Sequence, residues 1–398
     1  MSIRKVKDGI YSVGVKDPNL RKFDIVYDTP WGTTYNSYLI MAEKPVVVGT
    51  VKQGFHEEYL NNIKTLIDPS KIEYIVLDHS EPDHSWTVGK LLDIAPNAKV
   101  VATRAALNNL KEILNRDFQS ITAMDGNELD LGDRKLRFIS TPFLHWPDTM
   151  MSYDAHDKIL FTCDAFGSHY CPEGDRIFND EVGDITDAIW VYFNSIISPF
   201  KPKVIDAINK VRKLDLDFDM ICPGHGPILR DNPSANIALY EKWAKEPEYD
   251  SRKVSVYYAS AYGNTKKIAE RIACVLREKG LNAYTIDAAD VSKEDIDTNL
   301  QQSAGIVVGS PTIAGDVVEP IWNVLVNMNP LKAKGKVGAA FGSYGWSGEA
   351  LNMMEDMLES RKMNVVQPGI RFKFSPTEED MSKVDEFASR IAETVLNI

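Results

Sequence analysis

The chain has 398 residues, a formal net charge of −12 and 44% hydrophobic residues. This length exceeds what one hydrophobic core normally fills, so we expect two domains. Nucleic acids and anionic membranes attract surfaces with clustered Lys and Arg, and the acidic balance argues against both as partners. No apolar run is long enough to span a membrane, and the start Met-Ser-Ile-Arg-Lys lacks the apolar core of a signal peptide. We therefore expect a cytoplasmic protein.

The cysteine pattern also limits which disulfides and metal sites the chain can contain. The four cysteines are Cys163, Cys171, Cys222 and Cys274, and no two of them form a Cys-x-x-Cys pair. This spacing predicts neither a disulfide framework nor a four-cysteine iron site. We expect reduced thiols.

The first half of the chain alternates strand-like and helical patterns. Apolar runs at residues 45–48, 74–77 and 99–102 alternate with helical stretches as far as about residue 130, which predicts a sandwich of sheets and helices. Three later runs, at residues 135–139, 158–162 and 220–222, each end in a loop that carries a His or an Asp. Loops at strand ends are where sites are commonly built, so we expect the site of this domain there.

A polar stretch at residues 245–253 offers no apolar face to bury and predicts a linker. We therefore divide the chain into domains at residues 1–250 and 251–398. Regular strand–loop–helix units follow, and they predict a doubly wound parallel sheet. The expected strands lie at residues 254–259, 305–309 and 337–342, and the expected helices at residues 265–279, 318–326, 349–361 and 376–397. The last helix is expected to have Ser375 as N-cap and Pro376 as its first residue.

Seven potential metal ligands follow strand-like runs of the first domain. In chain order they are His79, Glu81, Asp83, His84, His145, Asp164 and His225. The first four occupy six positions on a loop that leaves a strand, where they can face one another and hold two adjacent metals. Most single histidines are core or capping residues, and His56 and His156, which lack this context, are assigned to that class.

The order and context of these ligands resemble the metallo-β-lactamase superfamily. The usual zinc pattern of that superfamily has a His where Glu81 stands, and additional carboxylates favour iron over zinc. With Asp164 as a bridge, each metal receives two His and at least one terminal carboxylate. One set is His79, Glu81 and His145; the other is Asp83, His84 and His225. His169 either orients Asp164 or donates a proton, or it is an ordinary loop histidine.

Three loops of the second domain are rich in Gly, Ser and Thr. The first loop joins a strand to a helix, so its backbone N–H groups and hydroxyls suit a phosphate, and it lacks the Lys of a nucleoside-triphosphate loop. Trp346 or Tyr344 offers a ring on which a flat heterocycle can stack, and the three loops together resemble those of flavodoxins. Ordinary turns are the alternative. The candidate flavin-binding residues are Ser260, Ala261, Tyr262, Gly263, Asn264, Thr265, Ser310, Pro311, Thr312, Ile313, Ala314, Gly315, Ser343, Tyr344, Gly345, Trp346, Ser347 and Gly348.

The two resemblances in this order, with a Gly-Thr-Thr-Tyr-Asn-Ser-Tyr segment at residues 32–38, identify the chain as a member of the flavodiiron (A-type flavoprotein) family. This resemblance implies an αββα sandwich of the metallo-β-lactamase type followed by a flavodoxin-like domain. It also implies FMN, two non-haem irons and the reduction of dioxygen to water or of nitric oxide to nitrous oxide. The implied electron donor is a small rubredoxin or, less favoured, a reduced deazaflavin. The implied assembly is a head-to-tail homodimer or a tetramer.

Three positions depart from the family pattern. Asp24 stands where several members have a His near the irons, and Gly49 replaces an Asp that is common in the superfamily. Phe193, next to Tyr192, occupies a position where many members carry a second Tyr, and we take both as candidate pocket residues with His169. Two other functions stay open: a dinuclear zinc hydrolase fused to a flavodoxin domain, and an electron-carrier flavodoxin with a degenerate partner domain.

Overall fold

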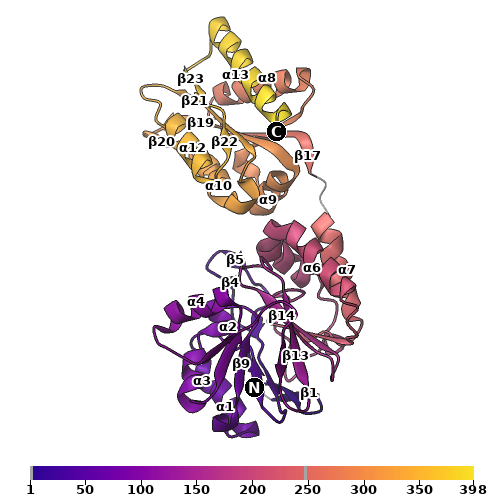
Figure 1. Cartoon of the computed structure of the whole chain (residues 1–398). Coiled ribbons are helices and arrows are strands. Elements are labelled where there is room, and N and C mark those ends of the chain that lie inside the picture. Colours follow the sequence, from indigo (N-terminus) through magenta and orange to yellow (C-terminus); the bar gives the residue numbers. More distant parts are fainter. Residues whose placement is uncertain (1–2, 246–248) are drawn as a thin grey trace. The chain divides into compact units, whose positions relative to one another are not determined.

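A computed structural model describes residues 3–245 and 249–398. Its contacts divide the chain into two compact units, Met1–Lys245 and Glu246–Ile398. Figure 1 shows the first unit in indigo to magenta and the second in orange to yellow. Each unit has its own sheets and its own core, so we describe them separately.

The first unit contains two large sheets and two short strand pairs. The seven-stranded sheet has the order β1 (Arg4–Lys7), β2 (Ile10–Ser12), β7 (Tyr38–Ile40), β8 (Val46–Val48), β9 (Tyr74–Leu77), β10 (Lys99–Ala102), β11 (Ser120–Thr122). The five-stranded sheet has the order β12 (Glu128–Asp130), β13 (Lys135–Ser140), β14 (Met150–Asp154), β15 (Ile159–Cys163), β16 (Met220–Pro223). The short pairs are β3 (Val15–Asp17) with β6 (Thr33–Tyr35), and β4 (Lys22–Phe23) with β5 (Tyr27–Asp28).

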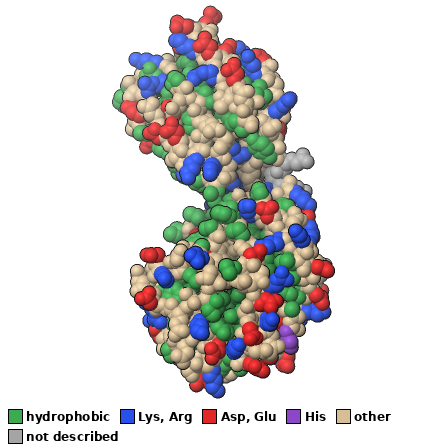
Figure 2. Space-filling model, viewed as in Figure 1, with side chains coloured by type: hydrophobic (Ala, Val, Ile, Leu, Met, Phe, Trp, Pro, Cys, Tyr) green, Lys and Arg blue, Asp and Glu red, His purple; other side chains and the backbone are tan. Residues whose placement is uncertain are grey.

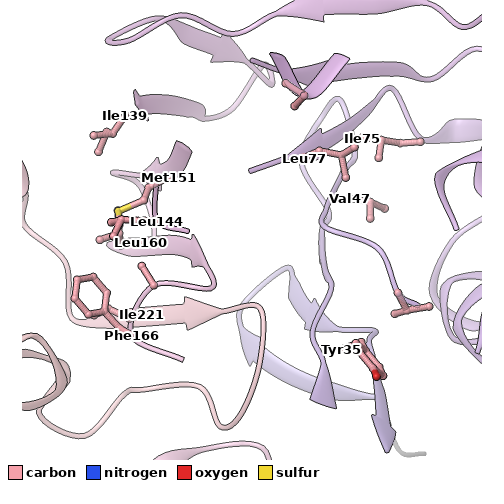
Figure 3. Close-up of a cluster of buried hydrophobic side chains, with 14 of the residues drawn as sticks. Tyr35, Val47, Ile75, Leu77, Ile139, Leu144, Met151, Leu160, Phe166 and Ile221 are labelled. Atoms are coloured by element: carbon pink, nitrogen blue, oxygen red, sulfur yellow. The ribbon is translucent and has the colours of Figure 1, made fainter. Parts of the chain in front are cut away.

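Helices pack on these sheets, and alternate residues of a strand enter different cores. The helices are α1 (His56–Leu66), α2 (Pro82–Ser85), α3 (Val88–Ile94), α4 (Arg104–Leu114), α5 (Thr186–Tyr192), α6 (Lys201–Lys213) and α7 (Pro233–Lys245). On β9, Ile75 belongs to one buried cluster and Val76 to another, as the period of two in a strand requires. Figure 3 draws part of the first cluster, with Ile75 from one sheet and Leu160 from the other. The expected αββα sandwich is confirmed.

The second unit is the expected doubly wound parallel sheet. Its strand order is β18 (Asn282–Asp287), β17 (Asp250–Tyr258), β19 (Ser303–Ile313), β21 (Val337–Tyr344), β22 (Asn364–Val365), while β20 (Asp316–Val317) pairs with β19 and β23 (Ile370–Lys373) with β21. Its helices are α8 (Asn264–Glu278), α9 (Lys293–Gln302), α10 (Glu319–Asn327), α11 (Pro330–Ala333), α12 (Ala350–Ser360) and α13 (Glu378–Leu396). Two buried clusters, one containing Ile272 and one containing Ile321, fill this unit. This order places the carboxyl ends of β17, β19 and β21 side by side.

Two boundary predictions were wrong. Helix α13 begins at Glu378, not at Pro376, and its N-cap is Thr377, whose hydroxyl accepts the backbone N–H of Asp380. Asp380 completes a capping box with Thr377, and this reciprocal pair outweighs the Ser-Pro signal before it. The expected linker at residues 245–253 is also too long, because β17 already begins at Asp250. Residues 246–248 of that stretch lie outside the described residues.

Helix hydropathy, surface charge and the state of the cysteines complete the description of the described residues. None of the helices in residues 3–245 and 249–398 is long and apolar enough to cross a membrane. On the face shown in Figure 2, Lys and Arg side chains are interspersed with Asp and Glu in each unit. All four cysteines are free, as their spacing predicted.

Candidate dimetal centre and flavin site

The loops at one end of the two large sheets bring the seven predicted ligands together. Strand β9 ends at Leu77, and the chain then passes through His79 to Glu81, the N-cap residue of α2. Pro82 is the first residue of α2, a position where its missing N–H costs nothing, and Asp83 and His84 follow on that helix. The remaining three ligands, His145, Asp164 and His225, lie on the loops after β13, β15 and β16.

One group of ligand atoms centres on Glu81. The Oε2 atom of Glu81 lies 3.1 Å from His79 Nε2 and 3.0 Å from His145 Nε2. The same two nitrogens lie 3.5 and 3.6 Å from Oδ2 of Asp164. Four potential ligands, two imidazoles and two carboxylates, therefore converge on one point.

A second group centres on Asp83. Its Oδ2 atom lies 3.5 Å from His84 Nε2 and 3.1 Å from His225 Nε2. These nitrogens lie 3.1 and 3.5 Å from Oδ1 of Asp164. One oxygen of Asp164 thus faces each group, which is the arrangement that a bridging carboxylate needs.

Hydrogen bonds outside the two groups set the orientation of two imidazoles. Nδ1 of His225 lies 2.6 Å from the Thr34 carbonyl oxygen, and a carbonyl only accepts, so Nδ1 carries the proton and Nε2 offers its lone pair. Nδ1 of His79 lies 3.2 Å from Asp148 Oδ1, and the backbone N–H of Ser80 donates to Asp148 Oδ2 at 2.8 Å. Our sequence reasoning missed Thr34 and Asp148, although Asp148 follows His145 by three positions.

The residues present fit two metal cations. Both oxygens of Asp83 and Oδ2 of Asp164 are buried without a hydrogen-bond partner, which is unusual for carboxylates unless a cation compensates them. Burial alone favours neutral acids, but hydrogen bonds from His145 and His79 hold the pKa of Glu81 below its usual range. Burial likewise opposes ionisation of Asp164, and His84 outweighs it and lowers its pKa. Both groups are therefore available as anionic ligands.

A cysteine that our sequence reasoning did not place at the site adjoins it. The Cys163 sulfur groups with ligand atoms of His84 and Asp164. Burial raises the pKa of this thiol well above its usual value, and nearby Asp164 adds to the effect. Because metals bind the thiolate, this keeps Cys163 a poor ligand.

Two of the three candidate pocket residues reach the ligands. The Tyr192 hydroxyl donates to Asp164 Oδ1 at 3.1 Å. The ring of His169 lies 5.1 Å from that of His225, and burial lowers the pKa of His169 well below its usual value. Phe193 packs instead against Trp190, Tyr240 and Trp243.

The two other departures from the family pattern have different surroundings. Asp24 lies in the turn between β4 and β5, where partial burial and the carboxylate of Glu81 raise its pKa to about 6. Because it interacts with Glu81, Asp24 adjoins the candidate metal ligands.

Gly49 has φ +70°, the left-handed region that favours glycine, and its carbonyl accepts the Ser37 hydroxyl at 2.7 Å.

The two histidines assigned to no site lie elsewhere. His156 is exposed beside Asp157, and His56 begins α1. Neither belongs to a metal-ligand group among the described residues.

The first flavin loop has the features of an anion site. Helix α8 begins at Asn264, and its N-cap Gly263, at φ +84°, leaves the first turn without a side-chain cap. The Ser260 hydroxyl is buried without a hydrogen-bond partner, and the hydroxyls of Thr265 and Ser343 lie 2.9 Å apart. Free N–H groups and convergent hydroxyls fit a phosphate.

The second and third flavin loops are shorter than expected. Strand β19 continues to Ile313 because Thr312 pairs with Val317 of β20, and the turn falls at Ala314 and Gly315. Strand β21 continues to Tyr344 because that residue pairs with Lys373 of β23. Residues 310–313 and 343–344 are therefore strand.

The carboxyl ends of the neighbouring strands still bring the three segments to one edge of the sheet. Two aromatic side chains there are almost fully exposed, Tyr262 at 93% and Trp346 at 90%. Exposed rings beside an anion site fit a flat heterocycle that carries a phosphate.

Comparisons with known proteins agree with this division. Residues 33–226 match the ODP family beta lactamase model, and residues 256–387 match the flavodoxin model. The flavo-diiron protein FprA2 of Clostridium acetobutylicum is 38% identical, with 98% of this chain and 99% of that protein covered. The nitric oxide reductase of Moorella thermoacetica is 33% identical, with 97% of each chain covered. Among solved structures, the rubredoxin oxygen:oxidoreductase from Desulfovibrio gigas matches with a TM-score of 0.73 at 29% identity, with 100% of this chain and 99% of that chain covered.

Proposed function

The chain belongs to the flavodiiron protein family, and from this premise we propose that it reduces dioxygen to water or nitric oxide to nitrous oxide. It is an oxidoreductase whose flavodoxin domain indicates FMN and whose family carries a non-haem diiron site. The observation that carries the proposal is Asp164, with one oxygen facing each group of ligands. Two metals held side by side by these ligands would suit a small oxidant.

The roles of the ligands follow from their contacts. His79, Glu81 and His145 would hold one metal, and Asp83, His84 and His225 would hold the other, with Asp164 placed to serve both. The carboxylate at Glu81 favours iron over zinc and so disfavours a zinc hydrolase. When bound, a pair of ferrous ions supplies two electrons and reduced FMN supplies two more, and the sum matches the four electrons that dioxygen requires. Tyr192 holds Asp164 through its hydroxyl.

The flavin is held by the carboxyl-terminal edge of the second sheet. The start of α8 would hold its phosphate, because the first turn of that helix has no side-chain cap and the Ser260 hydroxyl has no partner, while the Thr265 hydroxyl lies in that turn and contacts Ser343. Trp346 or Tyr344 would contact the isoalloxazine ring, since aromatic faces stack on flat heterocycles.

The working unit is a head-to-tail homodimer, and a rubredoxin-like protein delivers electrons from outside. Exposed apolar side chains adjoin the metal ligands: Ile25 follows Asp24, and Phe143 precedes His145 by two positions. Apolar surface next to a site is typical of a docking face. In a two-fold dimer the flavin loops of one chain cover this face of its partner, so each flavin serves the other chain's metals.

The proposed reaction is tested on protein purified without oxygen. We expect two irons and one FMN per chain, and consumption of dioxygen or nitric oxide when reduced rubredoxin is supplied. Two zincs in place of iron, or iron-loaded protein that consumes neither gas, would contradict the proposal.

The dimer is tested by mixing two inactive variants. His84→Ala removes a metal ligand, and the double substitution Thr265→Ala and Trp346→Ala removes flavin contacts. The mixed dimer keeps one complete pair of sites, so it should recover part of the turnover that neither parent shows. Heterodimers that form by native mass and stay inactive would rule out electron transfer between chains.

A further inference from the structure

A threonine hydroxyl lies between two buried imidazoles beside the proposed metals. Thr33 is the first residue of β6 and is fully buried. Its Oγ1 atom lies 2.9 Å from Nδ1 of His169 and 3.5 Å from Nδ1 of His225. A third neighbour, the Thr34 carbonyl oxygen, lies 3.3 Å away. The hydroxyl has one proton, so it donates to one of these three atoms.

Two of the three acceptors are disfavoured. Nδ1 of His225 carries a proton of its own, because it lies 2.6 Å from the Thr34 carbonyl oxygen, which only accepts. The Thr34 carbonyl oxygen has two lone pairs and can accept from both groups, but at 3.3 Å it is a more distant acceptor for Thr33 than Nδ1 of His169. The proton of Thr33 therefore points to Nδ1 of His169, the shortest contact at 2.9 Å.

This donation decides where His169 carries its own proton. A neutral imidazole has one N–H, and with Nδ1 accepting, that N–H is at Nε2. Nε2 of His169 is buried without a hydrogen-bond partner, which leaves it free for a ligand. The ring is held in place by Phe23, 4.4 Å away between centroids, and by Tyr192, edge-on at 4.8 Å. The ring of His225, a proposed metal ligand, lies 5.1 Å from that of His169 between centroids.

We infer that Thr33 is a positioning residue that holds His169 in the Nε2–H tautomer, so that this N–H is presented to an oxygen atom of the small oxidant. The inference rests on the proposed function for the identity of that acceptor. The tautomer itself is a property of the chain and can be measured separately.

The direct test is nuclear magnetic resonance of the FMN-bound full chain, freed of iron and labelled with ¹⁵N in the histidine rings. The two tautomers differ in the ¹⁵N shifts of their ring nitrogens, and the His169 signals are assigned by their loss in His169→Gln. The native protein and Thr33→Ser should show the Nε2–H form. Thr33→Val, which keeps the shape but removes the hydroxyl, should shift His169 toward the Nδ1–H form.

The inference is overturned if the native protein shows the Nδ1–H form, or if Thr33→Val leaves the tautomer unchanged. A matched control is Thr29→Val, because Thr29 is also fully buried and its hydroxyl has no hydrogen-bond partner. This control should leave the His169 signals as they are in the native protein.

The functional arm compares iron-loaded variants. Loss of an outer hydrogen bond of this kind typically costs about 10–100-fold in activity, so Thr33→Val should lower kcat by that factor at unchanged iron content. Thr33→Ser should restore most of it, and Thr29→Val should retain it. An unaltered kcat in Thr33→Val would also overturn the inference.

The two proposals fail in different ways. Failure of native iron-loaded protein to consume either gas contradicts the proposed function and leaves the tautomer result standing. Activity in the native protein, with the same tautomer in Thr33→Val, contradicts the inference alone.

Discussion

The metal centre and the flavin site are built in opposite ways. The candidate ligands of the metal centre are buried side chains apart from the half-buried His145, and the oxygens of Asp164 lie 3.1–3.6 Å from the imidazole nitrogens that they face. The flavin site consists mainly of backbone at one edge of a sheet, and its aromatic rings, Tyr262 and Trp346, are exposed. Packing within the protein sets the positions of the candidate metal ligands. At the flavin site, the bound flavin must supply the contacts that order Tyr262 and Trp346.

This difference has an electrostatic cause. Buried carboxylates and imidazoles are stable only when they compensate one another or a cation, so each substitution at the metal centre affects several neighbours. An exposed ring leaves no such imbalance when it is removed. We therefore expect large, coupled effects at the first site and small, separable effects at the second.

The largest effect is expected for Asp164→Asn. The amide keeps the shape of the side chain but loses the charge that faces four imidazole nitrogens. We expect iron content to fall and turnover to drop at least about 100-fold, beyond what outer-shell changes cause, while FMN stays bound. Metal analysis, flavin absorbance and gas consumption measure the three quantities. Asp154→Asn, equally buried at the end of β14, is the control and should retain iron. Loss of FMN in Asp164→Asn would contradict the expectation that the metal centre and the flavin site are independent of each other.

Glu81→His tests metal preference within the same centre. It replaces the carboxylate that lies 3.0–3.1 Å from two imidazoles by a third imidazole, which favours zinc. The iron-to-zinc ratio of the purified protein should fall at least about 10-fold, and reductase activity should fall with it. Glu81→Asp keeps a carboxylate and should stay closer to the native ratio. Full iron content and turnover in Glu81→His would show that Glu81 is not a ligand.

Trp346→Ala should have a smaller and purely local effect. Loss of a stacking ring costs about 1–1.5 kcal/mol, so the Kd for FMN should rise about 10-fold. The free energy of unfolding of FMN-free protein should change by less than about 0.5 kcal/mol, because the side chain is 90% exposed. Tyr284→Ala, an exposed aromatic on β18, is the control and should not change the Kd. A large loss of stability in Trp346→Ala would contradict the contrast between the sites.

Patterns of local sequence predicted the fold types, and the seven candidate ligands that they indicated do lie close together, on the loops after four strands or on the short helix α2. That these residues bind metal stays a prediction. The same reasoning could not find the contact of Thr33 with His169, which joins residues 136 positions apart. It also placed the start of α13 wrongly, because two local signals, Ser-Pro and the capping box at Thr377, compete there. Strand ends at Ile313 and Tyr344 depend on pairing with β20 and β23, which local pattern does not encode.

The last prediction concerns a largely buried charge, Lys336, which has no carboxylate partner among the described residues, in contrast to the charges of the metal centre. Burial lowers the pKa of Lys336 from its ordinary value of 10.5 to about 8, although its ammonium donates to the Ser303 carbonyl and lies 4.6 Å from the Tyr249 ring centroid. Between pH 8 and 10.5 the unfolded chain keeps a proton that the folded chain has lost, so the folded state gains stability as the pH rises. Below pH 8 the full cost of the buried charge is present.

Lys336→Met should therefore be more stable than the native protein at pH 7, by roughly 1–3 kcal/mol, and this advantage should shrink toward pH 10.5. Urea unfolding of the second unit, followed by flavin release at several pH values, measures the difference, with exposed Lys334→Met as the control. A stability difference that does not change with pH would show that the Lys336 ammonium is not destabilised by burial.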